Sequence, residues 1–219
     1  SMGARVNGAG GSIITVEGGA ALHGCTHRVI GDRIVCATYL CAAAAAGGEV
    51  RLTGVDYRAV STVALSLAES GCEVRSEADA VSLCSTGALR SVRPVRTAPY
   101  PGFPTDAQPV LMAALLRSEG CTVFVENIFE NRYRHVDELS RMGAEIRVAG
   151  RVAVVNGVRT LHGAAVKCTD LRGGAALVIA GLSAEGTTRV TELTHIDRGY
   201  DAIERDLAAL GAQIRRETT

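Results

Sequence analysis

The sequence predicts an α/β fold of three related units, with helices buried inside and sheets on the outside. Glycine followed by a small, a polar and an aliphatic residue recurs at positions 3, 71, 143 and 211, about 70 residues apart. Helical and strand-like segments alternate between these positions. The first helical segment of each unit is apolar on almost every side, which is typical of a buried helix. A repeat of this period indicates copies of one structural unit.

The first unit covers about residues 32–96. Its expected elements are a buried helix, a glycine-led strand, an amphipathic helix with the strand after it, and two further short strands: 34–46, 48–52, 60–70, 71–74, 80–84 and 92–96. Gly71 stands where the C-terminal cap of the amphipathic helix is expected, because glycine adopts the left-handed conformation that ends helices.

The second and third units repeat this order over about 106–168 and 170–216. The elements expected in the second unit are 110–117, 120–125, 136–142, 143–146, 152–155 and 164–168. Those expected in the third unit are 175–184, 186–193, 203–210 and 211–214. The third unit therefore lacks the last two strands of the pattern.

Residues 12–30 have the pattern of those two strands, since 16–18, 22–24 and 32–33 parallel 155–157, 161–163 and 170–172. We expect this hairpin to pair with the third unit of the same chain, with a swapped dimer as the alternative. Residues 3–6 look like a strand whose preceding helix is absent, so we expect the chain to be part of a longer protein. Residues 1–2 are interpreted as an expression scar and residues 3–219 as a single lobe.

Composition excludes several classes of protein. The chain is 47% hydrophobic and carries 23 basic and 23 acidic residues, which argues against disorder and against bulk nucleic-acid or membrane-surface binding. The seven cysteines are odd in number, scattered and without zinc spacing, which indicates a reduced, cytoplasmic protein. The longest apolar run, near residues 39–46, is too short to span a bilayer.

Acidic residues precede each predicted buried helix, at Asp32, Asp106 and Asp170. One interpretation is a set of helix caps, and Thr105 with Gln108 has capping-box spacing. The other is a functional site, with Asp106 available as a general base and the helix N-termini grouped around an anion. Both interpretations stay open at this stage.

Arginine-bearing turns favour an anionic ligand. Arg132 and Arg198 occupy equivalent turns of the second and third units, and Arg172 follows Asp170. Arginine suits bidentate binding of carboxylate or phosphate. Solvated arginines are the plain alternative, and Arg134 is interpreted as an ordinary helix-face charge. Among the histidines, which show no metal spacing, only His195 lies near a candidate site.

Four long motifs, at residues 103–108, 130–144, 170–175 and 195–200, closely resemble the UDP-N-acetylglucosamine enolpyruvyl transferase (1-carboxyvinyltransferase) family. The similarity runs from about residue 3 to residue 216 and favours this family over 5-enolpyruvylshikimate-3-phosphate synthase. It implies the inside-out α/β barrel of the enolpyruvyl transferases, with three βαβαββ-like repeats. It also implies transfer of the enolpyruvyl group of phosphoenolpyruvate to the 3′-hydroxyl of UDP-N-acetylglucosamine, the first committed step of peptidoglycan synthesis.

The resemblance further implies roles for individual residues. Asp106 would be the base near the sugar hydroxyl, and Ile128 would contact the nucleotide sugar through its backbone. Arg132 and Arg198 would bind phosphoenolpyruvate, while Asp170 and Arg172 would support the site and product release. No metal or organic cofactor is called for.

The family's other lobe carries a lysine–asparagine pair and a loop with a proton-donating cysteine, and neither has a counterpart in this sequence. We therefore expect the chain to be the second lobe only, to need the first lobe as its partner, and to be inactive alone. The alternative is a stand-alone ligand-binding or structural repeat module without catalytic function.

Overall fold

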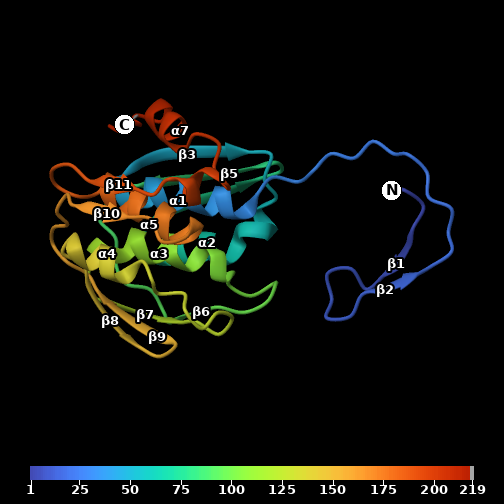
Figure 1. Cartoon of the computed structure of the whole chain (residues 1–219), viewed down its shortest axis with the longest axis horizontal. Helices are drawn as coiled ribbons and strands as arrows, with labels where there is room; N and C mark the ends of the chain where they lie inside the picture. The colour runs from blue at the N-terminus through green and yellow to red at the C-terminus, as the bar shows by residue number, and fades with distance from the viewer. Residues whose placement is uncertain (218–219) are drawn as a thin grey trace. The chain divides into compact units, whose positions relative to one another are not determined.

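The computed structural model describes residues 1–217. The chain divides into two compact units, a small N-terminal unit (Ser1–Gly31) and a large unit (Asp32–Thr219). Figure 1 labels their helices and strands.

The N-terminal unit, Ser1–Gly31, contains one strand pair. Strand β1 (Arg5–Asn7) runs antiparallel to β2 (Thr15–Glu17), with Val6 opposite Val16. The strand expected at residues 3–6 therefore forms. The hairpin expected at residues 12–30 does not: residues 18–31 have no strand assignment, and Thr15–Glu17 pairs with β1 instead. Pairing of residues 12–30 with the third repeat stays a prediction.

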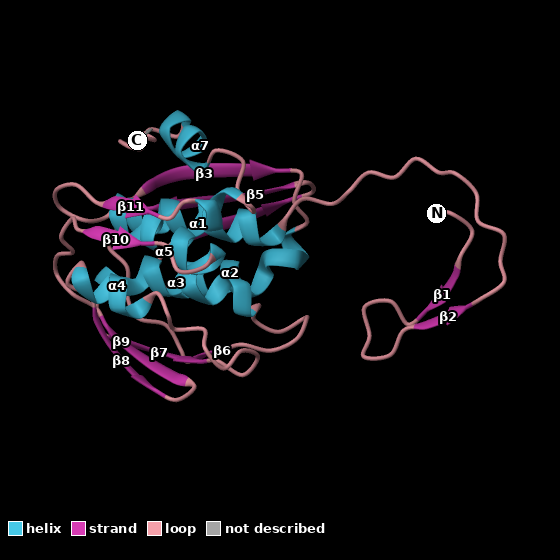
Figure 2. Cartoon of the chain, in the orientation of Figure 1, coloured by secondary structure: helices cyan, strands magenta, loops and turns pink. Residues whose placement is uncertain are grey.

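Three helices form the centre of the large unit, Asp32–Thr219: α1 (Arg33–Ala46), α3 (Gln108–Ala114) and α5 (Leu171–Leu182). Each contacts the other two, as Figures 1 and 2 show. Most of their residues are buried, α3 completely. The prediction that the first helix of each repeat is buried is confirmed.

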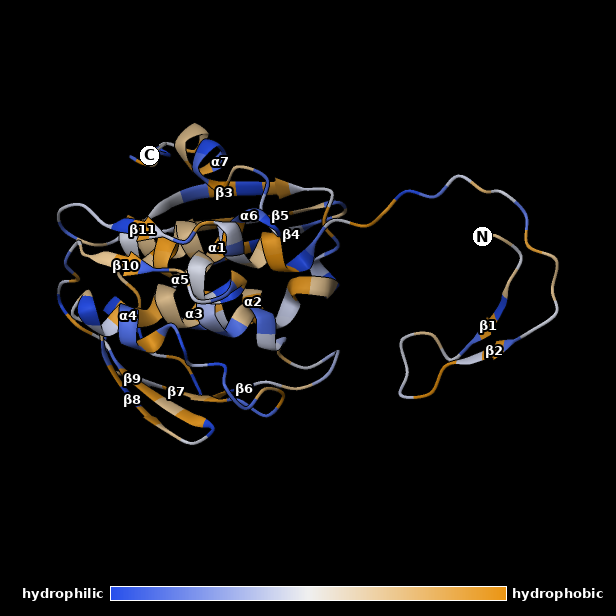
Figure 3. Cartoon of the chain, viewed as in Figure 1, coloured by the Kyte–Doolittle hydropathy of each residue, from blue (hydrophilic) through white to orange (hydrophobic). Residues whose placement is uncertain are grey.

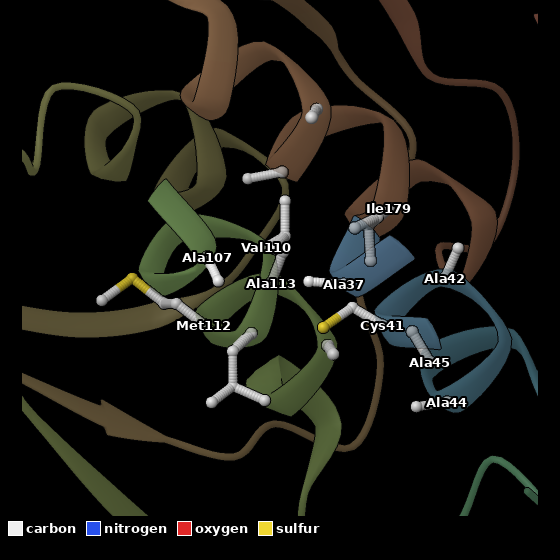
Figure 4. Close-up of a cluster of buried hydrophobic side chains, with 14 of the residues drawn as sticks. Ala37, Cys41, Ala42, Ala44, Ala45, Ala107, Val110, Met112, Ala113 and Ile179 are labelled. Carbon is white, nitrogen blue, oxygen red and sulfur yellow. The ribbon is translucent and has the colours of Figure 1, made fainter. Parts of the chain in front are cut away.

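The central helices pack through small and apolar side chains. Figure 3 shows that hydrophobic residues recur along these helices. In Figure 4, Ala37 of α1, Ala113 of α3 and Ile179 of α5 belong to one core, and all three are at most 1% exposed. Alanine allows helix backbones to approach closely, while branched residues fill the space between them. This core fixes the helix N-termini on which the candidate site depends.

The amphipathic helices also form where expected. They are α2 (Tyr57–Glu69), α4 (Val136–Arg141) and α7 (Ile203–Ala209), with a short α6 (Thr194–Asp197) before α7. Two 3₁₀ turns flank α3: η1 (Thr105–Ala107) and η2 (Leu115–Arg117).

Three sheets surround the helices, in the orders β3-β5-β4, β6-β7-β9-β8 and β10-β11. Their strands are β3 (Gly48–Thr53), β4 (Glu73–Glu77), β5 (Ala80–Ser85), β6 (Val95–Arg96), β7 (Cys121–Val125), β8 (Glu145–Ala149), β9 (Val152–Asn156), β10 (Ala165–Lys167) and β11 (Arg189–Thr191). The closed-barrel arrangement stays a prediction.

The last short strand of a repeat pairs with the sheet of the next repeat. β6 runs parallel to β7, and β10 runs parallel to β11. Sequence spacing assigned both strands to the units that precede them, because strand partners are not visible in local periodicity. This pairing joins successive repeats and brings their loops together.

One strand expected in the third repeat does not form. Residues 213–217 have no strand assignment, and no strand within the described residues pairs with them. The equivalent strands β4 and β8 each pair with the strand that follows them, β5 and β9. A strand depends on such a neighbour for its backbone hydrogen bonds, so residues 211–214 keep the pattern without the structure.

Equivalent backbone contacts occur beside the recurring glycines. The carbonyls of Ser70 and Met142, each directly before a recurring glycine, accept hydrogen bonds from the N–H groups of Arg90 and His162 at 2.9 and 2.8 Å. In the N-terminal unit, Ser1–Gly31, the carbonyl of Met2 accepts a hydrogen bond from the N–H of His23 at 3.0 Å. His23 and His162, which lie in the parallel segments 22–24 and 161–163, therefore make the same backbone contact.

Candidate active site

The three junction aspartates have two different roles. An Asp32 side-chain oxygen accepts from the N–H groups of Ile34 and Val35, at 2.7 and 3.2 Å. Asp170 caps α5 in the same way, accepting from Arg172 and Gly173 at 3.0 and 2.9 Å. For these two residues the helix-cap interpretation is correct.

Asp106 is not a cap, and the capping box expected between Thr105 and Gln108 does not form. Asp106 lies inside η1, and neither η1 nor α3 has a side-chain cap hydrogen bond. Pro109 lies in the first turn of α3, where it has no N–H to be satisfied. The extra 3₁₀ turn moves the Asp106 carboxylate out of the capping position.

Two arginines from distant segments bind this carboxylate. Arg132 Nη2 lies 2.7 Å from Asp106 Oδ1, and Arg172 Nη2 lies 3.3 Å from Oδ2. The side chains of Arg132 and Arg172 are 12% and 15% exposed, against 40% for Asp106. The alternative of solvated arginines is therefore wrong for both.

Further contacts hold Arg132 in one orientation. Its Nε donates to Thr105 Oγ1 at 3.0 Å, and its guanidinium carbon lies 4.6 Å from the centre of the Phe129 ring. Hydrogen bonds in fixed directions and an aromatic face suit a planar guanidinium. Asp106 is thus presented by a preformed set of neighbours.

All six site residues predicted from the sequence line one cavity, of about 700 Å³. They are Asp106, Ile128, Arg132, Asp170, Arg172 and Arg198. A second cavity, of about 260 Å³, shares Asp106 and Ile128 with it, so these two residues stand where the cavities meet. His195 does not line either cavity.

The larger cavity is rich in positive charge, which favours an anionic ligand. Arg134 and Arg151 line it together with the three nominated arginines, against the three acidic residues Asp106, Glu130 and Asp170. Arg134 was interpreted as a helix-face charge, and that interpretation is wrong. Arg151 carried no sequence signal, because the β8–β9 pairing brings it to the cavity.

Arg198 differs from the other nominated arginines. It is exposed at the C-terminal end of α6, and its guanidinium has no hydrogen bond or ion pair within residues 1–217. An exposed guanidinium at a cavity can bind a phosphate or carboxylate without first breaking an internal ion pair. The geometry therefore combines a carboxylate already bound by arginines with an arginine that is not engaged.

A buried histidine lies behind this site. His135 is 0% exposed, and burial lowers the pKa of its ring to about 4, against an opposing effect of the Asp170 charge. Neither ring nitrogen has a hydrogen-bond partner within the described part of the chain. His135 is thus neutral near pH 7.

Residues 1–217 offer neither a membrane-spanning helix nor a metal-ligand cluster. None of the helices there combines the length and apolar character needed to cross a membrane. The same residues hold no cluster of three or more metal-ligating side chains.

Comparison with known sequences gives consistent results. The family model described as EPSP synthase (3-phosphoshikimate 1-carboxyvinyltransferase) matches residues 1–207. The chain is 51% identical over 215 residues to UDP-N-acetylglucosamine 1-carboxyvinyltransferase of Gluconacetobacter diazotrophicus, covering 98% of this chain and 51% of that protein. It is 51% identical over 216 residues to the enzyme of the same name from Desulfofundulus thermocisternus, covering 98% of this chain and 88% of that protein.

The chain spans about half the length of most of the curated relatives that it matches, including 52% of the Caldanaerobacter subterraneus enzyme. Among solved structures, the enolpyruvyl transferase NikO from Streptomyces tendae has a TM-score of 0.80 at 30% identity, over 98% of this chain and 51% of its own. EPSP synthase from Acinetobacter baumannii shares the fold, with a TM-score of 0.68 at 22% identity over 87% of this chain and 45% of its own. The chain therefore belongs to the EPSP synthase (3-phosphoshikimate 1-carboxyvinyltransferase) family, and within it resembles the UDP-N-acetylglucosamine 1-carboxyvinyltransferases.

Proposed function

We propose that this chain is one lobe of a UDP-N-acetylglucosamine 1-carboxyvinyltransferase. The observation that carries the proposal is the Asp106 carboxylate, bound by two guanidinium groups in a cavity that five arginines line. A base beside an anion site is what the transfer of an enolpyruvyl group from phosphoenolpyruvate to a sugar hydroxyl needs.

The chemistry assigns Asp106 the hydroxyl proton. As the sugar oxygen bonds to C2 of phosphoenolpyruvate, the hydroxyl proton passes to Asp106 and the methylene carbon C3 gains a proton from an acid. Phosphate then leaves from C2 and C3 loses a proton, which restores the double bond. This chain would supply the base and the cations, and a partner lobe would supply the acid.

The arginines divide this work by their environment. Arg198, which is exposed, and Arg132, which lines the same cavity, would bind the phosphate and carboxylate of phosphoenolpyruvate. The backbone N–H of Arg172 donates to Asp170, which caps α5, and its side chain contacts Asp106. Arg172 would therefore keep the Asp106 carboxylate in position and assist release of the anionic product. Ile128, where the two cavities meet, would contact the nucleotide sugar.

Binding and turnover of the 219-residue chain test the proposal. We expect calorimetry to give dissociation constants on the order of millimolar for UDP-N-acetylglucosamine, or about 4 kcal/mol, because a partner lobe would share its contacts. Phosphate release with both substrates should stay at background, since catalysis also needs an acid and exclusion of water. Arg198→Ala should abolish binding of phosphoenolpyruvate, whereas Arg147→Ala, an exposed arginine on β8, should not change it.

Three outcomes would contradict the proposal in different ways. Micromolar binding would show that this chain forms the whole substrate site. Turnover within about tenfold of a two-lobe relative would show that it contains the acid. Equal binding by wild type and Arg198→Ala would support a non-catalytic module whose ligand site lies elsewhere.

A further inference from the structure

Glu126 is a buried carboxylate behind the site, and sequence reasoning passed over it. It directly follows β7 and is 1% exposed. A buried carboxylate is strongly destabilising unless hydrogen-bond donors surround it. Its partners therefore show what it does.

Four donors from three segments surround this carboxylate. Glu126 Oε1 accepts from Thr97 Oγ1 at 2.9 Å and from the N–H groups of Ile128 and Phe129 at 2.8 and 3.0 Å. Oε2 accepts from Thr105 Oγ1 at 3.0 Å. Glu126 thereby joins the end of β6, the η1 turn and the loop after β7, which together form one wall of the site.

The Oε2 contact fixes the direction of the Thr105 hydroxyl. A carboxylate can only accept, so Thr105 gives its single proton to Glu126 and keeps its lone pairs for other donors. Arg132 Nε donates to Thr105 Oγ1 at 3.0 Å, and Arg132 Nη2 lies 2.7 Å from Asp106 Oδ1. The hydrogen bonds thus run in one direction, from Arg132 through Thr105 to Glu126.

We propose that Glu126 is the positioning residue of this site: it fixes the Thr105 hydroxyl as an acceptor, and so holds the Arg132 guanidinium against Asp106. Its other oxygen holds the backbone of Ile128, which lines both cavities. The orientation of Arg132 follows from the contacts alone. The consequence for substrate binding rests on the proposed function.

Glu126→Gln tests this role, because an amide has one accepting oxygen and one donating NH₂ group. If the amide oxygen serves the three donors at Oε1, the NH₂ group faces Thr105 and competes with Arg132 for the same lone pairs. We expect the Arg132 Nε–H signal in ¹⁵N NMR spectra to shift and its hydrogen exchange to accelerate at least about tenfold, the factor expected for a lost charged hydrogen bond. Binding of phosphoenolpyruvate should weaken in parallel.

Matched variants separate positioning from general loss of stability. Thr105→Val removes the hydroxyl and should change the Arg132 signal as Glu126→Gln does. Thr105→Ser keeps the hydroxyl and should keep the wild-type signal. Glu49→Gln removes an exposed carboxylate on β3 and should leave the signal unchanged. If Glu126→Gln does not fold, the Thr105 pair decides.

An unchanged Arg132 signal in folded Glu126→Gln or in Thr105→Val would overturn the proposal. A changed signal in a chain that binds neither substrate would support the positioning role and refute the proposed function instead.

Discussion

At the scale of single residues, burial decides how His135 responds to pH. Its pKa of about 4 in the folded chain lies below the ordinary value of 6.5. The unfolded chain therefore binds more protons between these values, and stability falls as the pH decreases from about 6.5 to about 4. Above pH 6.5 both states are neutral and the effect vanishes.

We expect His135→Leu to remove this part of the pH dependence. Urea unfolding should show the free energy of wild type decreasing, relative to the variant, by roughly 3 kcal/mol between pH 7 and pH 4. His27→Gln, a substitution of an exposed histidine, serves as the control and should keep the wild-type profile. Parallel pH profiles for wild type and His135→Leu would show that His135 does not titrate in this way.

At the scale of elements, α5 depends on a close approach to its neighbours at Gly174. A Cβ atom there would collide with Cys168 Sγ and would lie 2.7 Å from Ile196 Cγ1 of α6. All three residues are buried, so little room exists for adjustment. Glycine is required here for packing, although alanine would suit the helix better by about 1 kcal/mol.

Gly174→Ala should therefore destabilise the chain, by about 1–3 kcal/mol, because the cost of overpacking exceeds the gain in helix propensity. Gly181→Ala is the matched control on the same helix, since its Cβ would lie 3.3 Å from Thr188 Cβ. It should change stability by less than about 1 kcal/mol. Thermal unfolding of both variants measures the difference, and equal midpoints would disprove the packing argument.

At the scale of the whole molecule, the strand pattern predicts that residues 12–30 complete the third repeat. Residues 211–214 have the sequence of a strand but no strand partner among the described residues. Four apolar side chains of residues 1–31 are exposed: Ile13, Val16, Val29 and Ile30. Docking within one chain costs loop closure only, whereas a swap between chains also costs association entropy.

We therefore expect a monomer by light scattering, with slow amide exchange at Thr15–Glu17 and at residues 213–216. Replacing Val16 by Asp should accelerate exchange at both segments. Asp at the exposed Ala78, in the β4–β5 turn, is the control and should change neither. Fast exchange in wild type, or a dimer, would contradict pairing within the chain.

The sequence by itself determined the features that depend on local spacing. Apolar residues on every side placed α1, α3 and α5 in the core, and recurring glycines marked the repeats. The motifs identified six residues that all line one cavity. Periodicity and turn chemistry act within a few residues, so one-dimensional patterns retain them.

Only the tertiary structure decided which of several possible partners each polar group has. Asp32, Asp106 and Asp170 occupy equivalent positions, yet two cap helices and Asp106 binds Arg132 and Arg172. Glu126 gave no signal because its donors come from three separate segments. Such choices depend on strand register and helix packing between distant residues, and a side chain is satisfied by whichever donor the fold brings within reach.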